Sequence, residues 1–130
     1  FEQMYGNEPS RWSDGLQRIP RLRLTVNAMA RMRALTRKEG NLEYKYKGTL
    51  GAMPEKLVPW FERADAVEGV RLFFGHWSAI GYHCHESIHA MDAGATWGNA
   101  LMAMRLEDEA QFFVPTVKGE EAGAALSGAQ

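Results

Sequence analysis

One stretch of the chain carries apolar residues at helical spacing. Residues 22–37 contain no Gly or Pro. Four apolar residues follow one another there at intervals of four, four and three positions, namely Leu24, Ala28, Met32 and Leu35. Such intervals place side chains on one face of an α-helix. The pattern therefore predicts an amphipathic helix over residues 22–37.

Elsewhere the apolar positions alternate or form short runs, which favours β-strands. Residues 42–47 alternate apolar and polar side chains, as a half-exposed strand does. Four more short strands are predicted over residues 70–74, 87–91, 100–106 and 111–114. A second helix is predicted over residues 55–66, with its regular part after Pro59 because proline disrupts a helix interior. The mixture indicates an α/β (α+β) fold class.

The two ends of the chain carry weaker signals. The first twenty residues contain several Gly and Pro and predict a loop with one short helix. The last thirteen residues are rich in Ala, Gly, Ser and Glu, which predicts a disordered tail over residues 118–130. Residues 1–117 are therefore expected to form the folded part.

Composition excludes some partners. The 130 residues include 15 basic and 16 acidic side chains, for a net charge of -1, which argues for neither a nucleic acid polymer nor a membrane surface as partner. No apolar run approaches the roughly 20 residues that span a bilayer, and the first residues lack a signal-peptide pattern. The single cysteine, Cys84, can form no internal disulfide, which agrees with a reducing compartment. We expect a cytoplasmic protein.

A histidine ends one of the predicted strands. The apolar run of residues 70–74 is followed by Gly75 and His76. Side chains at strand ends are held by the sheet yet exposed, and a neutral imidazole there suits a metal ion. The same histidine could equally be a packed or hydrogen-bonded group at a strand end.

Arginines line the predicted helix. Arg23, Asn27 and Arg31 are spaced four and four, so they form one polar stripe, and Arg33 with Arg37 forms another. A guanidinium fork matches phosphate oxygens, so the first stripe could bind a polyphosphate. The alternative is a solvated helix face.

Two further segments carry chemistry-bearing residues. The segment His83-Cys84-His85-Glu86, with His89 beyond, has metal-ligand residue types without the ligand spacing of a structural zinc site, which favours an exposed polar loop.

The glycine-rich bend of residues 92–99 is the second of these segments. It is either a plain hairpin connection or a loop that places Trp97 over a bound base, since an indole offers a large stacking face.

Six blocks in order resemble a known family. They are MYGNEPSRW (4–12), RLRLTVNAMARMR (21–33), LVPWF (57–61), FGHW (74–77), AMDAGATWGNAL (90–101) and MRLED (104–108). Together they look like the C-terminal half of the symmetrical bis(5'-nucleosyl)-tetraphosphatases, or diadenosine tetraphosphatases, which are calcineurin-like metallophosphoesterases. The resemblance spans most of residues 4–114.

The resemblance implies a fold and a site. The fold would be part of a β-sandwich flanked by helices, with a pair of divalent cations, Mn2+ or Co2+, at the strand ends. His76 would be a metal ligand and so a catalytic residue. The resemblance, with the stripes and the bend, also implies substrate-binding roles for Arg23, Asn27, Arg31, Arg33, Trp77 and Trp97.

The resemblance also implies an activity. A full-length family member would hydrolyse diadenosine tetraphosphate, or related dinucleoside polyphosphates, with two ADP as products. The family's upstream metal motifs GDxHG, GDxxxRG and GNH[DE] do not occur in these 130 residues. We therefore expect the 130-residue chain alone to be inactive. The alternative is a non-catalytic fragment that binds nucleotides without metals.

Overall fold

The computed structural model describes residues 2–65 and 68–117, and these contain one α-helix, eight short strands and five 3-10 turns. The helix is α1 (Arg18–Arg31). The strands are β1 (Ala34–Thr36), β2 (Leu42–Glu43), β3 (Leu57–Pro59), β4 (Leu72–Phe74), β5 (His83–His85), β6 (Ile88–Ala90), β7 (Ala100–Met104) and β8 (Gln111–Pro115). The 3-10 turns are η1 (Glu2–Met4), η2 (Leu50–Ala52), η3 (Trp60–Arg63), η4 (Ser78–Ile80) and η5 (Ala95–Trp97). The mixed α/β class is confirmed, whereas the predicted tail over residues 118–130 lies outside the described residues.

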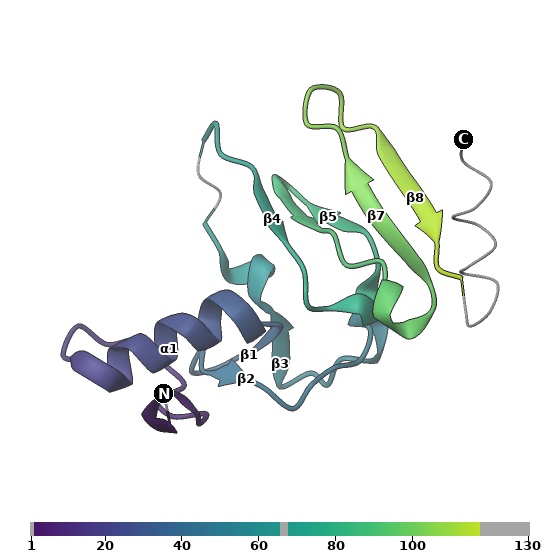
Figure 1. Cartoon of the computed structure of the whole chain (residues 1–130). Coiled ribbons are helices and arrows are strands. Elements are labelled where there is room, and N and C mark those ends of the chain that lie inside the picture. The colour runs from purple at the N-terminus through teal and green to yellow at the C-terminus, as the bar shows by residue number, and fades with distance from the viewer. Residues whose placement is uncertain (1, 66–67, 118–130) are drawn as a thin grey trace.

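The strands form three small sheets. The first has the order β2-β1-β3 and is antiparallel, and the second has the order β4-β6-β5, with β4 parallel to β6. The third is the β7–β8 hairpin. In Figure 1, α1 and the first sheet lie at one end of the molecule, the hairpin lies at the other, and β4 and β5 lie between them. None of the described helices is long and apolar enough to cross a membrane.

A small aromatic core connects η3, η4 and the second sheet. Phe61, Trp77 and Ile88 are each no more than 3% exposed. The Phe61 ring centroid lies 5.9 Å from that of Phe74 and 6.2 Å from that of Trp77. The Trp77 indole Nε1 donates a hydrogen bond to the Gly48 carbonyl at 2.9 Å. This core fixes the backbone immediately after His76.

The predicted helix over residues 22–37 is correct only in its first part. The helix begins earlier, at Arg18, and tolerates Pro20 because backbone N–H groups in the first turn have no partner within the helix. It ends at Arg31 because residues 34–36 instead form β1, the central strand of the first sheet. Ala34 is fully buried there, and pairing on both sides outweighs the helical spacing.

The predicted helix over residues 55–66 is wrong. Residues 57–59 form β3, which pairs with β1 through the register Leu35↔Val58, and only a 3-10 turn follows. All three residues of β3 are buried. A continuous buried apolar run suits a strand covered on both sides better than a helix with one apolar face.

The loop predicted at residues 83–86 is also wrong in part. His83, Cys84 and His85 form β5, which pairs with β6. The two histidine rings lie over Phe61, with centroid separations of 5.3 and 5.5 Å.

The strands predicted at residues 70–74, 87–91, 100–106 and 111–114 are confirmed as β4, β6, β7 and β8, while the one at 42–47 shrinks to β2.

Candidate functional site

His76 lies at the turn that follows β4. Its φ angle is 65°, in the left-handed region that residues other than glycine seldom adopt. Its neighbour Trp77 is 1% exposed, whereas His76 itself is exposed. The turn therefore directs the indole into the core and leaves the imidazole at the surface.

Arg33 holds His76 from a different segment. The Arg33 Nε donates to the His76 carbonyl at 2.8 Å, and a terminal guanidinium nitrogen lies 3.3 Å from His76 Nε2. A guanidinium has only donors, so Nε2 must be the acceptor and a neutral ring carries its proton on Nδ1. The Nε2 lone pair is thus engaged by the Arg33 guanidinium, which a metal ion at this nitrogen would have to displace.

Charge and burial act together on this pair. Partial burial, and then the Arg33 charge, lower the pKa of His76, and the Asp92 carboxylate opposes them. Burial, and then the Arg31 charge, lower the pKa of Arg33. The imidazole therefore favours its neutral form near pH 7, the form that binds metals.

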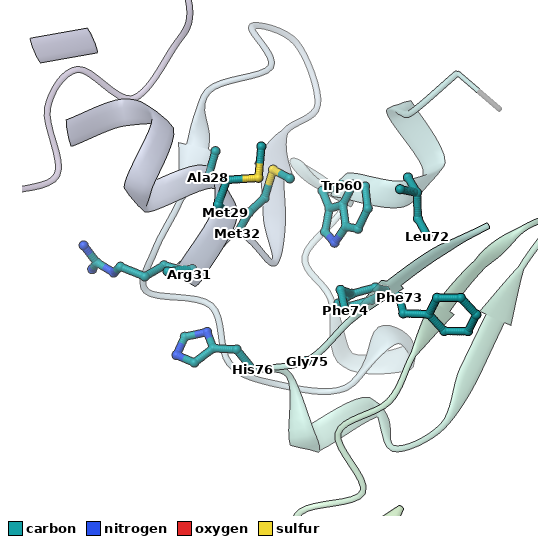
Figure 2. A pocket seen from close by; sticks show the side chains of 11 residues that line it. Ala28, Met29, Arg31, Met32, Trp60, Leu72, Phe73, Phe74, Gly75 and His76 are labelled. Carbon is teal, nitrogen blue, oxygen red and sulfur yellow. The ribbon is translucent and has the colours of Figure 1, made fainter. Parts of the chain in front are cut away.

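Two cavities meet at His76. The first, of about 500 Å³, lies between the C-terminal half of α1 and β4. Figure 2 shows Arg31 and His76 at one end of it, away from Trp60 and Leu72. Most of its lining is apolar, including Met29 and Met32, so its charged groups are confined to that end.

The second cavity is larger and more polar. It measures about 690 Å³ and is lined by ten residues, among them Arg33, Lys47, His76, Asp92, Trp97 and Asn99. Two of these side chains are cationic and one is a carboxylate. With His76 neutral, the cavity carries a net positive charge, as a phosphate-binding site does.

The stripe of Arg23, Asn27 and Arg31 shares one face of α1, but its contacts are internal. Arg23 donates from Nε to the Gln3 carbonyl at 3.0 Å and from Nη1 to the Glu8 carbonyl at 2.8 Å, and its Nη2 also donates to Gln3. All of its guanidinium nitrogens are engaged. The Arg23 fork thus holds residues 3–8, and its role as a phosphate clamp stays a prediction.

Asn27 and Arg31 continue the same contact. Asn27 is 4% exposed, donates to the Gly6 carbonyl at 2.9 Å and accepts from Arg31 at 3.0 Å. Arg31 also donates to the Asn7 side chain at 3.2 Å and lies 4.5 Å from the centre of the Tyr44 ring. Asn27 is thus a buried residue that connects α1 to the N-terminal segment. Arg31 is half-buried and lines one end of the first cavity.

The second stripe, Arg33 with Arg37, does not exist, since α1 ends before both residues. They lie on either side of β1. Arg37 donates to the carbonyls of Glu55 and Leu57 at 2.7 and 2.9 Å, which ties β1 to the segment before β3. Only Arg33 faces His76.

The two candidate stacking tryptophans differ sharply. Trp77 is 1% exposed and belongs to the core, although it also lines the second cavity, and its stacking role stays a prediction. Trp97 is 74% exposed in η5, between two glycines whose left-handed backbone tightens the turn, Gly94 and Gly98. A large exposed indole beside a cavity suits a stacking surface.

The histidines and cysteine of β5 and β6 show no metal-ligand arrangement. Cys84 is exposed, and its thiol contacts the Glu86 carbonyl at 3.3 Å. His89 is 2% exposed and stacks on Phe73 at 4.9 Å, with the Tyr82 hydroxyl 3.3 Å from Nδ1. Within residues 2–65 and 68–117, no three or more His, Cys, Asp or Glu side chains gather as metal ligands do.

Six of the ten residues that line the second cavity were not predicted as site residues, and three of these six carry charged or amide groups, namely Lys47, Asp92 and Asn99. Lys47 ends an alternating segment and so looked like a solvated strand residue. Asp92 and Asn99 flank the bend that was singled out for Trp97, and a Gly-rich bend with polar flanks was the available signal. Their convergence on Lys47 depends on tertiary packing.

The chain is similar in sequence to several curated proteins. No protein-family model matches it. A symmetrical bis(5'-nucleosyl)-tetraphosphatase of Chromobacterium violaceum is 49% identical over 114 residues, which cover 87% of this chain and 41% of that protein. The enzymes of the same name from Neisseria gonorrhoeae and Legionella pneumophila are each 46% identical, covering 84% and 88% of this chain and 40% and 42% of their own lengths.

The matches confirm the resemblance drawn from the six sequence blocks. The chain spans about 40% of the length of the curated relatives it matches. Over most of its own length, the chain is therefore a relative of the symmetrical bis(5'-nucleosyl)-tetraphosphatases.

Proposed function

We propose that the full-length protein hydrolyses diadenosine tetraphosphate, or a related dinucleoside polyphosphate, symmetrically, with two ADP as products of the former. One observation carries the proposal. His76, exposed and favouring its neutral form, lies with the Arg33 fork at the junction of two cavities, in a chain 46–49% identical to enzymes named for this reaction.

The proposal includes a divalent metal pair, Mn2+ or Co2+, with His76 as one ligand through Nε2. The residue fits, because the imidazole is exposed and favours its neutral form, and the metal would take the place of the Arg33 guanidinium at Nε2. A bound pair would supply Lewis-acid polarisation of the phosphoryl group. The remaining ligands would come from the motifs GDxHG, GDxxxRG and GNH[DE] of the full-length protein, since none of the three occurs in these 130 residues.

The chain's own residues would bind and orient the substrate. The Arg33 guanidinium would neutralise charge that develops on the phosphoryl oxygens, a role suited to a planar, always-charged fork. Arg31, which lines one end of the first cavity, would contact the substrate from there. The exposed Trp97 would receive a base, while Arg23 and Asn27 would hold residues 3–8 in place.

The test is product analysis with the purified full-length protein. Diadenosine tetraphosphate is incubated with Mn2+ or Co2+, and nucleotides are separated by anion-exchange chromatography. We expect ADP alone, and no turnover after EDTA treatment. ATP with AMP would mean a different cleavage position and would contradict the proposal, and nucleotide binding without turnover would support the non-catalytic alternative.

A further inference from the structure

The second cavity contains a cation that the proposed roles leave unused. Lys47 is exposed and lines this cavity together with Arg33 and His76. Both ion pairs found in the described part of the chain lie elsewhere, between Arg71 and Glu109 and between Arg105 and Asp108. The Lys47 ammonium is therefore available to a ligand.

The backbone around Lys47 is anchored on its C-terminal side. The Gly48 carbonyl accepts the buried Trp77 indole N–H at 2.9 Å, and the Tyr46 hydroxyl donates to the Thr49 carbonyl. Because the backbone at Lys47 is held in place, only the side chain must be ordered when a ligand binds, which lowers the conformational-entropy cost of binding. Trp77 thus acts from the core by positioning Lys47.

The opposite wall of the cavity is also fixed. Asp92 accepts a hydrogen bond from the Gly94 backbone N–H at 3.0 Å, and the Trp97 N–H donates to the Gly94 carbonyl at 2.9 Å. This turn presents the exposed indole on the same cavity as Lys47. A cation, a flat apolar face and a volume of about 690 Å³ suit a nucleotide.

We infer that this cavity binds one nucleoside diphosphate half of the substrate, with Lys47 on the phosphate that does not react and Trp97 against the base. The inference rests on the proposed function and adds a contact to it. Arg33 and His76 serve the reacting phosphoryl group. Lys47 then contributes equally to binding of ground state and transition state, so its loss should raise KM more than it lowers kcat.

The test compares Lys47→Met with Lys45→Met in the full-length protein. Both changes remove one charge and keep most of the stem, and Lys45 is exposed but does not line the cavity. We expect Lys47→Met to lose roughly ten- to a hundred-fold in kcat/KM on diadenosine tetraphosphate, the cost of one charge-assisted hydrogen bond. Lys45→Met should stay within about two-fold of wild type.

Two smaller ligands separate the contributions. The inhibition constant of ADP, which carries base and phosphates, should rise in both Lys47→Met and Trp97→Leu, whereas that of pyrophosphate should rise only in Lys47→Met.

The possible failures are distinguishable. Wild-type protein that does not cleave diadenosine tetraphosphate would overturn the proposed function. Wild-type cleavage with Lys47→Met equal to Lys45→Met would leave that function standing and overturn this inference. A lower kcat with an unchanged KM in Lys47→Met would place Lys47 at the reacting phosphoryl group instead, which also overturns the assignment.

Discussion

Trp77 and Trp97 form a matched pair, because one indole lies in the core and the other is exposed beside the second cavity. The same change, Trp→Leu, is made at each position in the full-length protein. Trp77 is 1% exposed, packs against Phe61 and donates to the Gly48 carbonyl, whereas Trp97 is 74% exposed. The two positions should therefore respond in opposite ways to assays of stability and of substrate binding.

The magnitudes follow from what each side chain contacts. Replacing a buried Trp by Ala costs about 3–5 kcal/mol, and a lost hydrogen bond is included in such values. Leu refills part of the volume, so we expect Trp77→Leu to lower the free energy of unfolding by about 3 kcal/mol. That loss corresponds to a fall in Tm of roughly 5 °C for a protein as long as the curated relatives.

Trp97→Leu should behave as a surface substitution in stability, within about 0.5 kcal/mol of wild type. It should instead weaken substrate binding roughly ten-fold, because stacking of a base on an aromatic ring contributes about 1–3 kcal/mol. Urea unfolding followed by circular dichroism measures the first quantity, and KM for diadenosine tetraphosphate measures the second. Equal stability losses at the two positions would refute the assignment of Trp77 to the core and Trp97 to the surface.

Three further outcomes are expected. His76→Ala in the full-length protein should reduce kcat by at least about a hundred-fold and lower the metal content measured by atomic absorption, since a lost ligand leaves the metal misplaced; unchanged metal content and activity would remove His76 from the site. Arg31→Lys should lower kcat/KM roughly ten-fold and also cost about 1 kcal/mol of stability, because the fork holds Asn27 and Asn7; unchanged stability would contradict these contacts. The 130-residue chain alone, with Mn2+ or Co2+, should show no turnover of diadenosine tetraphosphate above background, and clear turnover would refute our placement of the metal ligands.

Four strands could be predicted from the sequence, because their apolar composition and their pairing in the structure both favour a strand. The segments of β4, β6, β7 and β8 are rich in apolar side chains that suit strands, and β4 is followed directly by Gly75. The helix prediction was wrong at its C-terminal end, because Leu35 falls at helical spacing but lies in the strand β1. The pairing of β1 with β3 decides between the two, and no local signal records a partner more than twenty positions away.

The site was predictable only where one residue's local context was enough. His76 follows an apolar run and a glycine, so its place at a strand end could be inferred. The contact from Arg33 could not, because it depends on the helix ending at Arg31 rather than at residue 37. Trp77 and Trp97 look alike in sequence, and only packing separates the core residue from the exposed one.

The distribution of positive charge follows from which cations are engaged, and not from their number. The chain has a net charge of -1, yet the second cavity is positive. Several arginines donate to backbone carbonyls and so hold segments together, as Arg23, Arg37 and Arg71 do. Within the described residues Lys47 has no such contact, and Arg33 donates to the His76 carbonyl while lining the same cavity. Replacing either of these two should therefore change ligand binding, whereas replacing an arginine of the first group should mainly change stability.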